Sequence, residues 1–237
     1  MTHALRIVAA AAFAALPFLA QAADARLAPA VSGFSGIRLA IPAKMEVIQG
    51  DAESIAVEGP EEDLAKIEIV VESGVLQIRQ RERNTRWSTW NTKFRVTVNA
   101  KRVESLGISG SGEILAKTLR TPALKLAISG SGDIRVPSLD TEKTTVSISG
   151  SGDVVVAGKS GTIDSHISGS GTVKAERLDS RQAMVAISGS GDAILWARES
   201  LQVKIAGAGD VRYYGDPTVE KRIAGSGSVK RLGLAPS

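Results

Sequence analysis

The sequence predicts an all-β protein whose C-terminal half is a single-stranded, right-handed parallel β-helix, with an irregular β cap on its N-terminal side. Two observations predict this class. A glycine-rich motif recurs seven times at nearly constant spacing, and apolar residues around the copies alternate with polar ones. Alternation with a period of two indicates strands, because successive side chains of a strand point to opposite faces. A repeat of about 20 residues is too short for a propeller blade, which needs about 40.

The repeated motif reads Ile-Ser-Gly-Ser-Gly-acid-aliphatic, and successive copies are 20, 20, 19, 20, 18 and 18 residues apart. The copies begin at Ile108, Ile128, Ile148, Ile167, Ile187, Ile205 and Ile223. Three short strands fit in one repeat, so each copy predicts one rung of 18–20 residues, with identical positions stacked about 4.8 Å apart. The crossover rule predicts a right-handed coil. A second inward-facing strand is predicted in three rungs by Leu119, Leu139 and Leu178.

The parity of the motif predicts which side chains face the core. Ile128, Gly130 and Gly132 share one parity, whereas Ser129 and Ser131 share the other. If the segment is extended throughout, the glycines point inward at a wall that lies too close for a side chain, and the serines point outward. The alternative is a corner in which one glycine adopts a positive φ.

Residues 31–98 lack the motif but also alternate as strands do. The candidate strands are Gly36–Ile41, Met45–Gln49, Ser54–Glu58, Ile67–Val71, Val75–Gln80 and Phe94–Val98. Glu72-Ser73-Gly74 predicts a hairpin turn, and Glu61–Lys66 predicts one helical turn. The first rung of a β-helix has an open edge that must be covered. We therefore interpret residues 23–98 as a cap with irregular first rungs and 99–231 as the repeat β-helix, with 31–231 forming one domain.

The first residues predict export. Arg6 precedes an almost wholly apolar run, Ile7–Leu19, and Ala20-Gln21-Ala22 is a small-x-small cleavage site. The run is shorter than the roughly 20 residues of a spanning helix, and Pro17 interrupts it. We expect a signal peptide over residues 1–22, no transmembrane segment after its removal, and a periplasmic or extracellular location.

Charge and cysteine content narrow the function classes. The net charge is only +4 and the chain has no cysteine. So small an excess of basic residues argues against a nucleic-acid partner for an exported protein. Without disulfides, core packing must hold the fold. No cofactor is predicted.

Several segments together resemble the family called putative auto-transporter adhesin, head GIN domain. The resemblance rests on Val31-x-Gly33-Phe34-x-x-Ile37, Gln49-Gly50-Asp51, Gly74-Val-Leu-x-Ile78 and the serial Gly-Ser-Gly-Asp rungs, over roughly residues 33 to 230. It implies a β-helical protein that is secreted or associated with the envelope. It carries over no catalytic residue, and an adhesive role follows from it only by analogy.

The best candidate binding site is the loop between Arg79 and Arg95. The loop contains a single acid, Glu82, and six basic residues: Arg79, Arg81, Arg83, Arg86, Lys93 and Arg95. The loop also holds Trp87 and Trp90. Arg beside Trp is a composition typical of sites for sugars or anionic groups. We name Arg83, Arg86, Trp87 and Trp90 as the candidate site; the alternative is that both Trp residues cover the end of the β-helix.

A column of acids offers a second candidate site. It contains Glu113, Asp133, Asp153, Asp192 and Asp210, interrupted by Thr172 and Ser228. Stacked carboxylates can pair on a cation, as in calcium-binding β-helices, but those have a period of nine. Exposure to water and local pairing of Asp133 with Arg135 and of Asp210 with Arg212 favour a solvated turn without metal.

Asp164-Ser165-His166 has the composition of a catalytic triad. Adjacent residues of a strand point to opposite faces, so Ser165 is expected to point away from His166. The sequence therefore favours a non-catalytic envelope or surface module that binds a glycan, an envelope polymer or a protein through the flat β-helix face or the Trp-Arg loop. The alternatives are a purely structural periplasmic scaffold and, less favoured, a polysaccharide-acting enzyme.

Overall fold

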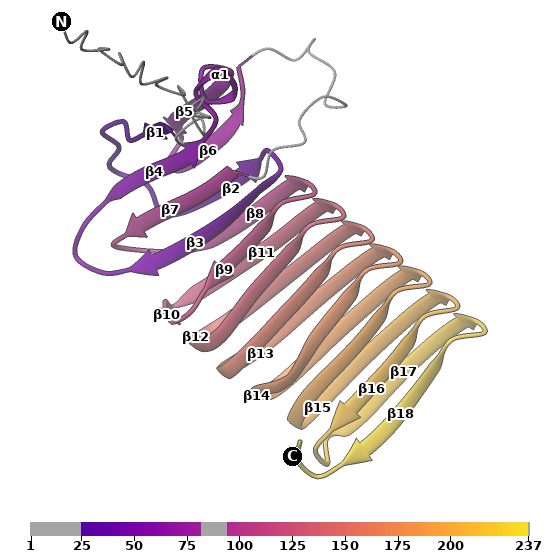
Figure 1. Ribbon diagram of the computed structural model, residues 1–237. Helices are drawn as coiled ribbons and strands as arrows, with labels where there is room; N and C mark the ends of the chain where they lie inside the picture. Colours follow the sequence, from indigo (N-terminus) through magenta and orange to yellow (C-terminus); the bar gives the residue numbers. More distant parts are fainter. Residues whose placement is uncertain (1–24, 82–93, 237) are drawn as a thin grey trace, which may run out of the picture.

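The computed structural model describes residues 25–81 and 94–236, and Figure 1 shows a β-solenoid of about six turns beneath a curled mixed sheet at the N-terminal side. The strands of the repeat half are β8 (Ser105–Gly110), β9 (Glu113–Ala116), β10 (Leu119–Arg120), β11 (Ala123–Gly130), β12 (Asp133–Gly150), β13 (Asp153–Gly169), β14 (Thr172–Gly189), β15 (Asp192–Gly207), β16 (Asp210–Tyr214), β17 (Thr218–Gly225) and β18 (Ser228–Gly233). The predicted all-β solenoid is confirmed.

The repeat sets the register of the solenoid. Neighbouring rungs pair in parallel, so that Ile128 lies beside Ile148 and Gly130 beside Gly150. The stacking of identical motif positions is therefore confirmed. The right-handed coil stays a prediction.

A complete rung of the repeat half has three sides, which the alternation of buried and exposed residues outlines. In β12 the alternation is interrupted by pairs of exposed residues at 137–138 and 142–143, and again around the motif. We call the segment that leads into the motif the first side (144–149 in β12), the segment after it the second side (133–136), and the short segment between them the third side (139–141). The predicted inward residues of the third side are buried: Leu119, Leu139 and Leu178.

The two glycines of the motif do different jobs at the corner between the first and second sides. Gly150 has a φ of 125° and is half-exposed, so this glycine makes the corner and the extended interpretation is wrong there. Gly152 is buried, as its parity predicts. Its close neighbour is the corner of the preceding rung, at Gly132, and not an opposing wall. The serines of the corner are exposed, as expected.

The N-terminal half also stacks in rungs, but not in chain order. Its elements are β1 (Ala25–Leu27), β2 (Gly36–Ala40), β3 (Ala43–Gln49), β4 (Ser54–Gly59), α1 (Glu61–Leu64), β5 (Ile67–Glu72), β6 (Val75–Gln80) and β7 (Phe94–Ala100). Strands β2 and β3 pair in parallel with β8 and β9 on one side and with β6 and β7 on the other. Antiparallel β5, β4 and β1 then curl over the top (Figure 1).

The expected elements of this half are all present within a few residues of their predicted bounds. The predicted hairpin turn joins β5 to β6, and both Ser73 and Gly74 have a positive φ there. The predicted helical turn is the single turn α1. Its partners β4 and β1 close the edge that the first rungs would otherwise expose. Among the described residues, no helix is long and apolar enough to cross a bilayer.

Candidate functional site

The candidate residues Arg83, Arg86, Trp87 and Trp90 lie outside the described residues, as does the predicted signal peptide. The flanking strands nevertheless fix where this loop begins and ends. Arg79 of β6 pairs with Ala40, and Phe94 of β7 pairs with Ala43. Both loop ends therefore lie beside the corner between β2 and β3, next to the corner at which the motif serines stack.

The surroundings of this loop are less positive than the sequence alone suggested. Arg79 donates hydrogen bonds to Glu68, at 2.7 Å, and to Glu72, at 2.9 Å. These bonds, with Glu72 contributing most, raise the pKa of the Arg79 guanidinium above its usual value. Arg95 lies 3.6 Å from Glu58. Two of the six basic residues thus meet carboxylates: Arg79 meets those of β5 across the predicted hairpin, and Arg95 meets one from β4, which is remote in the sequence.

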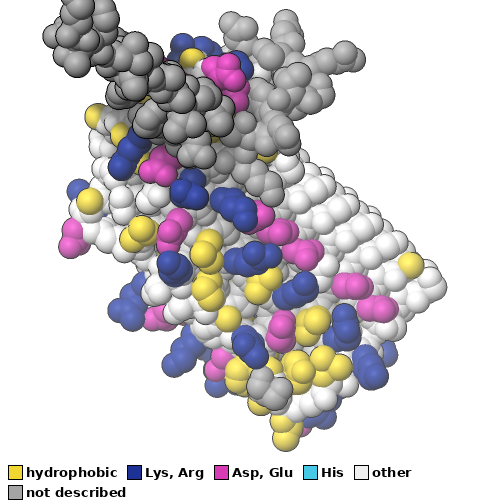
Figure 2. All heavy atoms as spheres, in the orientation of Figure 1, with side chains coloured by type: hydrophobic (Ala, Val, Ile, Leu, Met, Phe, Trp, Pro, Cys, Tyr) yellow, Lys and Arg dark blue, Asp and Glu magenta, His cyan; other side chains and the backbone are white. Residues whose placement is uncertain are grey.

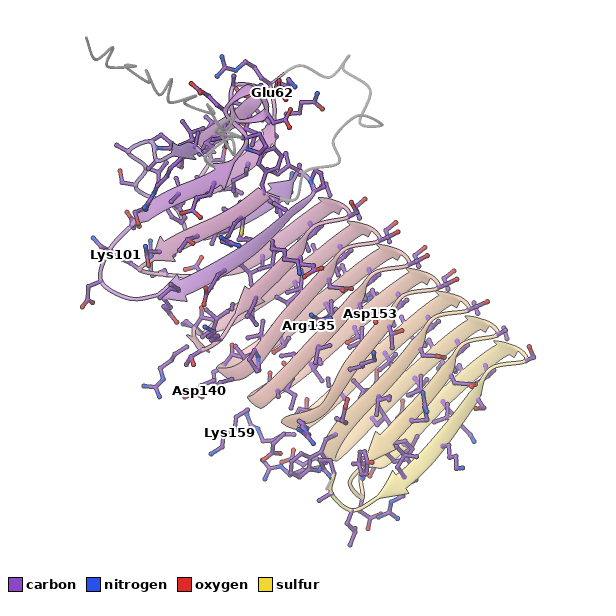
Figure 3. All side chains as sticks on the ribbon, in the orientation of Figure 1. Glu62, Lys101, Arg135, Asp140, Asp153 and Lys159 are labelled. Atoms are coloured by element: carbon purple, nitrogen blue, oxygen red, sulfur yellow. The ribbon has the colours of Figure 1, made fainter. Side chains whose placement is uncertain are left out.

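The acid column forms as predicted but is half-buried, not exposed. The carboxylates hold adjacent rungs together: Asp133 accepts a hydrogen bond from the backbone N–H of Asp153 at 3.3 Å, and Asp192 accepts one from Asp210 at 2.9 Å. The predicted Asp133–Arg135 pair is present at 3.5 Å, and Figure 3 shows Arg135 and Asp153 on the same side of the solenoid.

The predicted Asp210–Arg212 pair is not formed. Asp210 instead accepts hydrogen bonds from the backbone N–H and hydroxyl of Ser228, at 3.0 and 2.8 Å. In the described part of the chain, no three His, Cys, Asp or Glu side chains gather closely enough to hold a metal ion. The other two acids of the column meet lysines of neighbouring rungs: Glu113 lies 3.4 Å from the Nζ of Lys44, and Asp153 lies 3.4 Å from the Nζ of Lys174.

Ser165 and His166 point to opposite faces, as predicted. Ser165 is fully buried, whereas His166 is exposed and its Nδ1 lies 3.3 Å from the Oδ1 of Asp164. The nucleophile of a triad would have to reach the same imidazole, and Ser165 cannot.

The first side carries a groove of about 980 Å³ that sequence reasoning did not locate. Its floor is built from two outward-facing columns on either side of the motif isoleucines. The column after each isoleucine is Ser109, Ser129, Ser149, Ser168, Ser188, Ala206 and Ala224. The column before each isoleucine, extended upward into β2, is Arg38, Gly107, Ala127, Ser147, His166, Ala186, Lys204 and Arg222. We call this hollow the serine-face groove.

Strand pairing makes the column before the isoleucines continuous. Arg38 pairs with Gly107, each following member pairs with the next, and Lys204 pairs with Arg222. Small residues occupy most of the middle, and basic residues stand at both ends. A side chain at Gly107, Ala127 or Ala186 larger than the present one would fill the hollow.

The charges of the groove are of one sign. Among the described residues that line it, Arg38, Lys204 and Arg222 are basic and none is acidic. These three form no ion pair with another described residue. Asp164 and Glu220 stand in the next outward column, where Asp164 contacts His166. Figure 2 shows that acidic and basic side chains mix over the face in view, whereas few charges lie along the edge where the motif corners stack.

Residues 33–217 match the family described as putative auto-transporter adhesin, head GIN domain. The chain belongs to this family. The resemblance that the rungs suggested is therefore confirmed over most of the sequence. No curated protein matches the GIN-domain chain.

Solved structures share the fold. A putative adhesin from Bacteroides fragilis superposes with a TM-score of 0.82 at 22% identity, covering 88% of this chain and 97% of its own. A protein from Parabacteroides distasonis described as a putative lipid binding protein has a TM-score of 0.73 at 23% identity, over 90% of this chain and 98% of its own. A putative adhesin from Parabacteroides merdae has a TM-score of 0.70 at 21% identity, over 90% and 97%. At these identities the likeness shows the fold alone.

A pattern in the sequence could have predicted the serine-face groove. The residues directly before the motif isoleucines are mostly small, which predicts an outward-facing column of small side chains, and Lys204 and Arg222 add basic side chains to that column in the last rungs. Arg38 could not be placed in the same way, because β2 lacks the motif and its register with β8 emerges only in the folded GIN domain.

Proposed function

We propose that this GIN-domain chain is an exported, non-catalytic binding module of the cell envelope that holds an anionic glycan or another anionic envelope polymer. The observation that carries the proposal is the serine-face groove, whose described lining contains three basic residues and no carboxylate. Guanidinium and ammonium groups without an ion pair among the described residues can attract carboxylate, sulfate or phosphate. No acid among the described lining residues offsets their field, although Asp164 and Glu220 stand in the next column, so three basic residues against none in the groove favour ligands of negative charge.

The shape of the groove favours a polymer over a small molecule. It is a shallow hollow that runs across rungs and not a closed cavity within one rung. Small-molecule sites usually enclose most of their ligand. Exposed serine hydroxyls along one border can donate to and accept from sugar hydroxyls. The family's description as adhesins is consistent with such a role, and export is part of the proposal.

The proposal is tested by presenting the mature chain with matched polymers. Immobilised polygalacturonate, heparin and poly(glycerol phosphate) are the anionic probes, and dextran and amylose are the neutral controls. We expect saturable binding to at least one anionic probe and none to the neutral ones. Binding to no anionic probe would overturn the proposal in favour of a structural scaffold, and release of shortened oligosaccharides would overturn its non-catalytic part.

A further inference from the structure

We propose that the serine-face groove binds its anionic polymer lengthwise, with the polymer crossing successive strands along the solenoid axis and anchored at both ends. This inference rests on the proposed function and adds the site, the direction of the chain and a minimum ligand length. Arg38 is the anchor near the cap, and Lys204 with Arg222 is the anchor in the last rungs.

The register between neighbouring strands indicates the direction in which the polymer lies. Arg38, the intervening small residues and Lys204 belong to a single column in which each residue pairs with its neighbour on the next rung. Six strand steps at roughly 4.8 Å separate the two anchors by about 29 Å. Only a ligand that runs across the strands can contact both, because both lie in one column.

The distribution of bulk supports the same direction. Between the anchors, Gly107, Ala127, Ser147 and Ala186 leave room along the column, and the motif serines border it on the corner side. On the other border stand longer side chains, such as Lys125 and Met184, both exposed. A ligand lying along a strand would meet this border two residues from the groove column. A ligand lying along the solenoid axis would meet only one bulky side chain among the described residues of the column between the anchors, that of His166.

Two separated anchors predict a threshold in ligand length. An oligomer shorter than about 29 Å can engage one anchor only. Once it spans both, the second contact becomes intramolecular, and linking two contacts can raise affinity by about 10²–10⁴ without any new contact. A one-ended site predicts no such step.

The test uses an oligogalacturonate trimer, which is well short of the span, and a dodecamer, which is well beyond it. Affinities for the wild type, Arg38→Glu and Lys204→Glu/Arg222→Glu are measured by calorimetry, after circular dichroism shows that each variant folds. Lys159→Glu and Lys159→Glu/Lys230→Glu are the matched controls. Lys159 is exposed and lies on the rim of the solenoid opposite the motif corners (Figure 3).

The dodecamer contains several trimer-length segments, which alone raise its apparent affinity. After correction for this statistical factor, we expect the wild type to bind the dodecamer at least about tenfold more tightly than the trimer. Arg38→Glu should remove this gain while changing trimer binding less than about twofold, because the trimer prefers the pair of basic residues at the other end. Lys204→Glu/Arg222→Glu should weaken both oligomers, and the control reversals should weaken neither.

Each contrary result has one meaning. If the wild type binds neither oligomer, nor the other anionic probes, the proposed function itself fails. If both oligomers bind and Arg38→Glu behaves like Lys159→Glu, the lengthwise two-anchor site is wrong while the proposed function stands. If palmitate displaces the dodecamer and charge reversals leave palmitate binding unchanged, the groove belongs to an acyl chain and this inference is overturned.

Discussion

Gly152 lies so close to the corner of the preceding rung that a Cβ atom on it would collide with the carbonyl oxygen of Gly132. The same Cβ would stand 2.7 Å from the Cγ2 of Ile128. The carbonyl cannot easily give way, because it accepts the backbone hydrogen bond of Asp153 at 3.3 Å. The second motif glycine is therefore a packing requirement that every rung repeats.

Replacing Gly152 by valine should destabilise the fold, whereas Ser151→Val should not. Overpacking a tight site typically costs about 1–3 kcal/mol, and the exposed Ser151 should change the free energy of unfolding by less than about 0.5 kcal/mol. Urea unfolding of the two variants measures the difference. Equal midpoints for both would contradict the packing of this corner.

Gly150→Ala should also destabilise, but for a different reason. Gly150 has a φ of 125°, a conformation that L side chains rarely adopt. An alanine there would be strained and would also collide with the carbonyl oxygen of Gly130. We expect a loss of at least about 1 kcal/mol by chemical unfolding. Ser149→Ala, at the exposed neighbouring position, is the control and should stay near wild type.

The sequence predicted the structure correctly where the motif repeats. Identical residues recur in the motif, so a single period predicts that Gly130 stacks on Gly150, and parity predicts that Ser165 and His166 point to opposite faces. Parity failed at Gly150, because residues at a corner do not alternate between faces as they do in a strand. The positive φ of Gly150, which forms that corner, cannot be read from the alternation of the sequence.

The order in which the strands of the cap stack could not be predicted from the sequence. Each of these strands was predicted from local alternation, yet their order in the stack is not their order in the chain, since β6 and β7 pair with β2 and β3 from above. The contact of Arg95 with Glu58, across the pairing of β7 with β4, depends on that order. The place of Arg38 in the groove was hidden for the same reason, because it depends on the pairing of β2 with β8.

Chelators should leave the fold intact. The carboxylates of the acid column contact neighbouring rungs, either by accepting a hydrogen bond, as Asp192 does from Asp210, or by pairing with a lysine, as Glu113 does with Lys44, so no cation is needed to offset their charge. Thermal unfolding with and without EDTA should give the same midpoint. A drop of many degrees that calcium reverses would show that the column holds a metal ion.

Lys221→Val should promote self-association through the last rung. Lys221 is exposed although it lies in register with the buried Val203, so it places a charge where the core meets the outermost described strand. Inward-pointing charges at a sheet edge discourage pairing with another chain. Light scattering should show larger species for this variant than for Lys230→Val, whose lysine faces outward. Monomeric behaviour of both variants would assign no protective role to Lys221.

The last prediction concerns the Trp-Arg loop. If Arg83, Arg86, Trp87 and Trp90 contact an anionic polymer, Arg83→Glu/Arg86→Glu and Trp87→Ala/Trp90→Ala should each weaken binding. Guanidinium groups can pair with carboxylate or phosphate, and a Trp face can stack on a sugar ring. The Arg contribution should fade with added salt, because exposed charges are screened within about 10 Å at 0.1 M ionic strength.

The comparison is made with the polymer that binds the wild type, after circular dichroism confirms that each loop variant folds. The strands that flank the loop end beside the β2–β3 corner, and Arg38 belongs to β2, so one ligand segment could meet both the loop residues and Arg38. In that case the loop variants and Arg38→Glu should weaken binding non-additively, since they act on one ligand segment. Unchanged binding in both loop variants would confine the contact to the serine-face groove, and loss of folding in the Trp pair alone would mark those residues as part of the cap.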